Sequence, residues 1–162
     1  MPVADTRADL TSTSPFAGAR RSRAGLPWPV LGAVSAGGII GALGRYALGQ
    51  AYPHPAAGFP WATFGINVSG CLLIGVLMVL VADVWPTRRL LRPFLGTGVL
   101  GGYTTFSPYV VDVQHLAIAG AARTALVYLA ATVLAALTAT YAGVSATRLL
   151  TSRIRHRKET TG

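Results

Sequence analysis

The sequence GTGVLGGYTTFSPY, residues 96–109, decides how this chain folds. It lies in an apolar run, residues 93–120, that is long enough to cross a bilayer, which takes about 20 apolar residues. The centre of the run holds Gly101 and Gly102, a Thr-Thr pair and Pro108, so we expect the backbone to leave the helix there. Inside hydrocarbon, such backbone must be buried in protein or line a wet or ion-filled cavity, because unpaired polar groups are costly. The stretch is therefore predicted to be a functional site.

The composition is that of a small integral membrane protein. Of 162 residues, 52% are hydrophobic and 12% are charged, with a mean hydropathy of +0.50. An ordinary soluble domain has about 25% charged residues. The net charge of +9 would suggest a nucleic-acid partner in a soluble protein, but here the basic residues lie just outside the apolar runs, as membrane topology signals do. We therefore predict a membrane protein with no nucleic-acid partner.

Four apolar runs are predicted to be transmembrane helices, which makes this an all-α membrane protein. Their approximate bounds are 28–50, 59–82, 93–119 and 124–147, and the third is expected to be broken in the middle. They form a transmembrane domain over residues 27–147, between a disordered basic N-terminal tail, residues 1–26, and a basic C-terminal tail, residues 148–162. The first run exceeds a signal-peptide core of about 7 to 15 residues, so we interpret it as a membrane span.

The distribution of positive charge predicts the orientation of the chain. Four spans place both tails and the loop after the second span on one side of the membrane. The opposite side has only Arg123. By the positive-inside rule, both termini are expected in the cytoplasm of a multi-pass protein of the cell membrane. The basic residues on the predicted cytoplasmic side are Arg7, Arg20, Arg21, Arg23, Arg88, Arg89, Arg92, Arg148, Arg153, Arg155, Arg157 and Lys158.

Two polar side chains stand out in the first two spans. In the first, Gly37 and Gly41 have the G-x-x-x-G spacing that lets helices approach closely, and Arg45 follows them. Arg45 is either a helix-end residue that reaches the interface or a vestibule residue that attracts anions. In the second, Asn67 is the one amide, and it either joins helices or presents N–H donors to an anion in transit.

The predicted break combines groups that suit ions of both signs. Backbone carbonyls exposed at a break suit a hard cation such as Na⁺, whereas hydroxyls, helix N-termini and an amide NH2 group suit a small anion. Phe106 and Tyr109 lie three residues apart, so their rings share one face if the helix resumes. The edge of an aromatic ring is the positive end of its quadrupole and can contact an anion weakly enough to release it.

Three segments resemble the CrcB, or Fluc, family of fluoride ion channels: GALGRY (41–46), FPWATFGINVSG (59–70) and GVLGGYTTFS (98–107). The resemblance covers residues 31–141. It implies a subunit that passively exports fluoride and performs no enzyme chemistry, in an antiparallel, dual-topology dimer with two pores. It also implies a Na⁺ ion at the dimer centre, held by the backbone carbonyls of Gly101 and Thr104, and Arg45 in a vestibule. The anion pore would be lined by Asn67, Thr105, Phe106, Ser107 and Tyr109.

Two features of this chain depart from the family pattern. Pro108 and Tyr109 stand where Thr and Phe usually follow the TTFS motif, which leaves open whether both pores conduct, and Asp112 replaces a Glu. An antiparallel homodimer also needs a nearly balanced charge bias, and this chain is strongly biased. We therefore expect it to pair with a homologous subunit of opposite topology rather than with itself.

Two other functions fit parts of the sequence. A small four-helix exporter of cationic drugs also forms antiparallel dimers, but it needs a membrane-embedded carboxylate, and the first span has none. A purely structural membrane subunit would explain the packing glycines but not a cluster of hydroxyls and aromatic rings at a helix break. The fluoride channel is therefore the preferred hypothesis.

Overall fold

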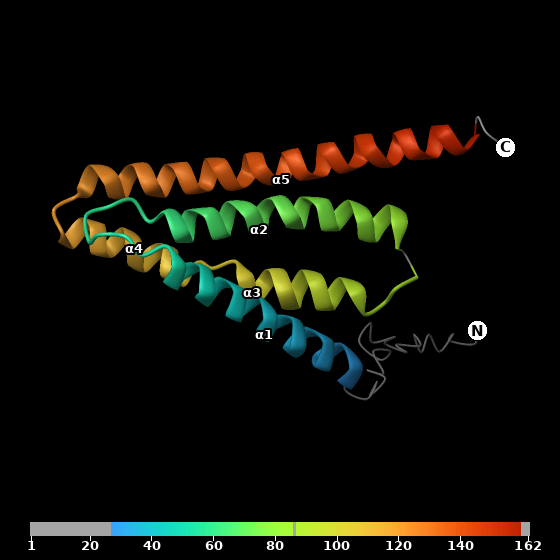
Figure 1. Ribbon diagram of the computed structural model, residues 1–162, viewed down its shortest axis with the longest axis horizontal. Coiled ribbons are helices and arrows are strands. Elements are labelled where there is room, and N and C mark those ends of the chain that lie inside the picture. Colours follow the sequence, from blue (N-terminus) through green and yellow to red (C-terminus); the bar gives the residue numbers. More distant parts are fainter. Residues whose placement is uncertain (1–26, 86, 160–162) are drawn as a thin grey trace, which may run out of the picture.

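The computed structural model describes residues 27–85 and 87–159, so the N-terminal tail expected over residues 1–26 lies outside the described part of the chain. Every regular element in this part is a helix, which confirms the all-α prediction (Figure 1). Helix α2 continues into a π-helical segment, η1, and the π-helical segment η2 continues into α3. The elements are α1 (Trp28–Ala51), α2 (Trp61–Val79), η1 (Leu80–Val84), η2 (Pro93–Leu100), α3 (Gly101–Tyr103), α4 (Ser107–Ile118) and α5 (Ala122–Glu159).

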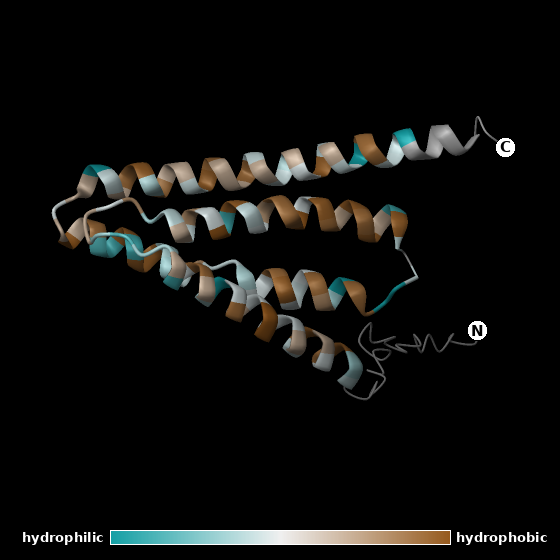
Figure 2. Cartoon of the chain, viewed as in Figure 1, coloured by the Kyte–Doolittle hydropathy of each residue, from teal (hydrophilic) through white to brown (hydrophobic). Residues whose placement is uncertain are grey.

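Three helices among the described residues are long and apolar enough to cross a membrane. They are Trp28–Ala51, Trp61–Val84 and Ala122–Arg153, with mean hydropathies of 1.3, 2.4 and 1.8. In Figure 2, brown, hydrophobic colour dominates the second half of α2 and alternates with paler turns along α1 and α5. The prediction of a membrane protein is therefore supported by helix length as well as by composition.

The third apolar run consists of separate helices rather than one. Helix α3 ends at Tyr103, Thr104 is extended with φ −72° and ψ 158°, and α4 begins at Ser107. Pro108 in the first turn of α4 explains this start, because proline has no N–H and its ring would clash with the carbonyl of Thr104 if the helix continued backwards.

The expected role of the two glycines is wrong. Gly101 and Gly102 are both helical, Gly101 with φ −65° and ψ −35°, and the backbone leaves the helix only at Thr104. The one positive φ among the described residues is at Gly120, in the turn between α4 and α5. Gly102 is required for close packing instead, because a Cβ there would lie 3.1 Å from the Cα of Gly38 and would overlap that residue's carbonyl oxygen.

The helices lie roughly along one long axis, with their connections at two ends (Figure 1). The start of α1, the end of α5 and the connection between η1 and η2 lie at one end, and the α1–α2 and α4–α5 connections lie at the other. Helix α1 packs against η2 and α3, whereas α5 packs against α2 and α4. The third run therefore contacts α1 before residue 104 and α5 after it.

Helix α1 approaches η2 and α3 at backbone distance, as its G-x-x-x-G spacing predicts. Gly37 and Gly41 are buried, and a Cβ on Gly41 would lie 2.8 Å from the backbone nitrogen of Tyr103 and would overlap the carbonyl of Val99. A Cβ on Gly37 would lie 2.9 Å from the backbone nitrogen of Val99. The predicted close packing is confirmed, and we call these contacts the glycine seam.

Around α4 the packing is aromatic instead. Tyr109, Leu116, Ala125 and Tyr128 form a buried cluster between α4 and α5, and Phe59 packs against it from the α1–α2 connection. The rings of Phe59 and Tyr128 meet edge to face, with centroids 5.2 Å apart. We call this cluster the aromatic core.

Helix α5 continues through most of the segment expected as a C-terminal tail. It ends at Glu159, so residues 148–159 are helical. This segment contains neither glycine nor proline, and nothing in its sequence interrupts the helix that arrives from the membrane span.

Candidate functional site

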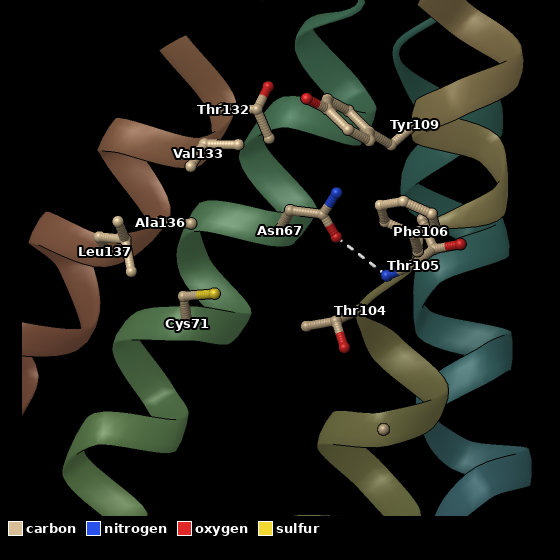
Figure 3. Close-up of a pocket in the computed structure, with 11 residues that line it drawn as sticks. Asn67, Cys71, Thr104, Thr105, Phe106, Tyr109, Thr132, Val133, Ala136 and Leu137 are labelled. Carbon is tan, nitrogen blue, oxygen red and sulfur yellow. Dashed lines mark hydrogen bonds between the residues drawn. The ribbon is translucent and has the colours of Figure 1, made fainter. Parts of the chain in front are cut away.

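A cavity of about 530 Å³ opens beside the non-helical segment, between α2, α3, α4 and α5 (Figure 3). One wall comes from α2 and the α3–α4 connection, and the facing wall comes from α5. Six of the predicted site residues line it. The complete lining is Asn67, Cys71, Gly101, Thr104, Thr105, Phe106, Tyr109, Thr132, Val133, Ala136 and Leu137.

Asn67 connects α2 to the non-helical segment. It is only 9% exposed, and its side-chain oxygen accepts a hydrogen bond of 2.9 Å from the backbone N–H of Thr105 (Figure 3). Because an N–H group can only donate, the oxygen must face Thr105, and the NH2 group of Asn67 is turned elsewhere. Figure 3 shows this nitrogen turned away from Thr105, on the side of Tyr109. Asn67 therefore brings N–H donors to the cavity wall.

The same hydrogen bond releases a backbone carbonyl. In a continuous helix the N–H of Thr105 would bond to the carbonyl of Gly101, four residues earlier, but here it donates to Asn67. The carbonyl of Thr104 loses its helical donor too, because Pro108, four residues later, has no N–H. The Thr104 hydroxyl donates its proton to the carbonyl of Leu100 at 2.9 Å, so Thr104 offers only acceptors to the site, its backbone oxygen among them.

Arg45 accounts for another carbonyl at the end of α3. Its Nε donates a 3.1 Å hydrogen bond to the carbonyl of Gly102, which brings a positive charge to the C-terminus of that helix. Arg45 also lines a second cavity, of about 290 Å³, together with Tyr46, Thr63 and Pro108. Thr105 borders both cavities, so the non-helical segment lies between them. Arg45 therefore has a structural contact with α3 and also lines a cavity, while its role as a vestibule residue stays a prediction.

Phe106 and Tyr109 line the first cavity in different ways. Their ring centroids are 6.0 Å apart, as their spacing predicts, yet Phe106 is 75% exposed and Tyr109 only 8%. The Tyr109 hydroxyl donates to the carbonyl of Leu129 at 2.9 Å and ties α4 to α5. The hydroxyl that distinguishes Tyr109 from the family's usual Phe is therefore used for packing, and the ring is the part that the cavity meets.

Two predicted polar residues lie outside both cavities. Ser107 is exposed at the start of α4 and lines neither of them. Asp112 accepts a 3.4 Å hydrogen bond from the Tyr128 hydroxyl, and its other oxygen lies 3.9 Å from Nε2 of His54. Asp112 is thus tied to the α1–α2 connection and to α5 instead of facing either cavity.

The contribution of α5 residues to the site was not predicted from the sequence. We interpreted the span of residues 124–147 mainly as packing surface, but Thr132, Val133, Ala136 and Leu137 form a wall of the first cavity (Figure 3). The Thr132 hydroxyl donates to the carbonyl of Tyr128 at 2.7 Å, as threonines within helices often do, so it adds no free donor. The i, i+4 spacing of Thr132 and Ala136, both small, was the available signal.

The fold and the cavity define a helical membrane protein with a polar, ring-lined site beside a non-helical segment. Residues 32–144 match the family model described as "CrcB-like protein, Camphor Resistance (CrcB)", and the chain belongs to this family. This confirms the resemblance found in the sequence.

Three relatives illustrate the match, and each is called a fluoride-specific ion channel. The chain is 60% identical over 104 residues to FluC 2 of Streptomyces avermitilis, covering 64% of this chain and 66% of that protein. It is 55% identical over 120 residues to FluC 1 of Streptomyces coelicolor, covering 74% and 78%. It is 52% identical over 126 residues to FluC 2 of Nocardia farcinica, covering 78% and 90%.

Proposed function

We propose that this chain is a subunit of a fluoride-specific ion channel that lets F⁻ leave the cytoplasm passively and that it catalyses no reaction. The relatives' shared name supports the choice of ion. The observation that carries the proposal is the hydrogen bond from Thr105 to Asn67, because it commits the Asn67 oxygen to the protein and leaves the NH2 group for an anion. The exposed ring of Phe106 beside it offers the weak second contact that a conducting site needs.

The third membrane span, in this proposal, consists of η2, α3 and α4 and is broken at residues 104–106. A break at membrane depth requires other parts of the protein to satisfy its polar backbone groups. Asn67 does this for Thr105, and Arg45 does it for Gly102. Residues 104–106 can then provide polar groups to the cavities while several of their backbone N–H and carbonyl groups keep hydrogen-bond partners.

The carbonyls of Gly101 and Thr104 fit the Na⁺ ion that the family implies. Both have lost their helical donors, and oxygen atoms are the ligands that a hard cation prefers. A cation there would be coordinated by the two carbonyl oxygens in place of the missing N–H donors and would hold α3 against its counterpart in a dimer. We therefore propose that Gly101 and Thr104 hold Na⁺ through their backbone oxygens.

Charge supports an orientation with both termini in the cytoplasm and an antiparallel partner of opposite topology. Of the basic residues outside the first span whose side chains the structure describes, Arg88, Arg89, Arg92, Arg148 and Arg153 belong to the side that the sequence assigns to the cytoplasm, and Arg123 belongs to the other. Such a bias favours one orientation, whereas an antiparallel dimer needs two. We propose that a homologous subunit supplies the second orientation.

The cation exporter is disfavoured by the surroundings of Asp112. A proton-coupled exporter needs a carboxylate that faces its substrate, and the carboxylate of Asp112 accepts from Tyr128 and lies outside both cavities. Two flux assays on the same purified protein distinguish the functions. A cation exporter would transport a cationic dye, whereas a fluoride channel would conduct F⁻.

Fluoride efflux from liposomes tests the proposal. The chain alone and the chain with an opposite-topology homologue are reconstituted, with Cl⁻ efflux as the selectivity control. The proposal predicts F⁻ efflux without Cl⁻ efflux from the pair, little from the chain alone, and its loss in Phe106→Ile. Robust efflux from the chain alone would reject the obligate pair and keep the channel, whereas no F⁻ efflux from either preparation would reject the channel.

A further inference from the structure

A third cavity, of about 300 Å³, lies at the end of the molecule where the η1–η2 connection is found. One wall is apolar and belongs to the end of the second span. The other is basic and belongs to the connection, which is coloured hydrophilic in Figure 2. The lining residues are Met78, Val81, Ala82, Trp85, Arg88 and Arg92.

The two arginines of this cavity are available to a ligand. Arg88 and Arg92 are exposed, and the ion pair found among the described residues joins His54 to Asp112 elsewhere. Arg89, between them in the sequence, does not line the cavity. Guanidinium groups bind phosphate oxygens through paired N–H donors, so two of them at one cavity favour a phosphate group.

The apolar wall distinguishes a lipid from a free phosphate. Met78 is 50% exposed, and Leu73 and Ile74, one turn earlier in α2, are exposed at 49% and 37%. The cavity thus continues onto an apolar helix surface of the kind that faces acyl chains. Trp85 lies just after the span Trp61–Val84, at the position where tryptophan marks a membrane interface.

We propose that this cavity binds an anionic phospholipid, with its headgroup phosphate at Arg88 and Arg92 and its acyl chain along Met78 and Ala82. Basic pockets between membrane helices on the cytoplasmic side favour such headgroups. The predicted orientation places this end at the cytoplasmic leaflet. The lipid would fix the connection between η1 and η2, and its binding is independent of which ion the protein conducts.

Native mass spectrometry of the full-length protein, titrated with phosphatidylglycerol or phosphatidylcholine, tests the site. The test variant is the double substitution Arg88→Gln/Arg92→Gln. The matched control, Arg89→Gln/Arg148→Gln, removes the same charge from exposed residues outside the cavity. We expect the test variant to bind phosphatidylglycerol about twenty-five-fold more weakly, taking roughly fivefold for each arginine, and the control to stay within about twofold of the unmodified protein. Equal losses in both variants would overturn the site, since they would show only a general charge effect.

Two further arms separate the lipid from a soluble phosphate. Ala82→Trp fills the apolar part of the cavity without changing charge and is expected to weaken phosphatidylglycerol binding severalfold. Glycerol phosphate and inorganic phosphate at millimolar concentration are expected to displace little bound lipid. Full displacement by either compound, or unchanged lipid binding in Ala82→Trp, would instead assign the arginines to a soluble anion and overturn the proposal.

Discussion

The two halves of the third apolar run are held in place by opposite means. Before residue 104, η2 and α3 pack against α1 through the glycine seam, where backbone meets backbone. After residue 106, α4 packs against α5 through the aromatic core, where large side chains meet. The glycine seam leaves no space for a side chain at the contact, whereas the aromatic core is formed by large side chains that fill the space between the helices.

The non-helical segment lies where these two kinds of packing meet. The chain changes its packing partner at residues 104–106, and neither neighbour covers that segment completely. Asn67 and Arg45, from α2 and α1, supply the polar contacts that the missing helical turn would have made. The proposed ion site therefore lies where the two kinds of packing meet.

The largest effect is expected from breaking the glycine seam. In Gly41→Val the new side chain would overlap the backbone of Val99 and Tyr103, which cannot move aside as a flexible side chain can. We expect a loss of stability of about 3 kcal/mol or more, and poor recovery of folded protein. The measurement is thermal unfolding in detergent together with size-exclusion elution.

Gly32→Val is the matched control for this prediction. It places the same side chain in the same helix, but no atom lies within 4 Å of its Cβ. The comparison fails if both variants unfold at the same temperature, because the seam would then carry no special packing.

A smaller effect is expected from Arg45→Ala. The substitution removes the donor to the Gly102 carbonyl and the charge at the end of α3. Loss of one partner of a partly buried hydrogen bond should cost about 1 to 3 kcal/mol. Thermal unfolding of Arg45→Ala and Arg45→Lys measures it, with Lys expected to retain part of the stability. Wild-type stability in Arg45→Ala would show that the hydrogen bond to Gly102 does not stabilise the fold, and would contradict this prediction.

The smallest effect is expected from Tyr109→Phe in the aromatic core. The ring remains and only the hydrogen bond to the Leu129 carbonyl is lost. Hydrogen bonds between membrane helices contribute about 0.6 kcal/mol on average, so stability should fall slightly and fluoride efflux should persist. Tyr141→Phe, at a 76% exposed ring, is the control. Abolished efflux in Tyr109→Phe would place the hydroxyl in the ion path after all.

Much of this architecture is readable from the sequence because the bilayer restricts the choices. Apolar runs of sufficient length predict helices, and Pro108 limits how far α4 can extend backwards. The G-x-x-x-G spacing predicted the seam because it depends only on residues four apart in one helix. These signals are local, so a single sequence contains them.

The details of the site depended on contacts between distant residues. The sequence singled out Asn67 but could not show that its oxygen bonds to Thr105, 38 residues away. It assigned the departure from the helix to Gly101 and Gly102, whereas Thr104 makes that turn and Gly102 packs against α1. The contribution of α5 to the cavity was missed because Thr132 and its neighbours are small and apolar enough to resemble packing surface.

The central claim is that the side-chain oxygen of Asn67 accepts a hydrogen bond from Thr105, while its NH2 group donates to the conducted anion. Asn67→Asp separates the two roles, because a carboxylate still accepts the Thr105 N–H but replaces the donors with negative charge. The measurement is fluoride efflux from liposomes at pH 8, in the assembly that conducts, alongside thermal unfolding of the same preparation. We predict that the protein still folds, with some loss of stability because a carboxylate replaces a side chain that is only 9% exposed. Efflux should fall at least about a hundredfold, since like charges about 4 Å apart repel by about 4 kcal/mol at an effective dielectric constant of 20. Efflux at the wild-type rate from a folded Asn67→Asp protein would contradict the account.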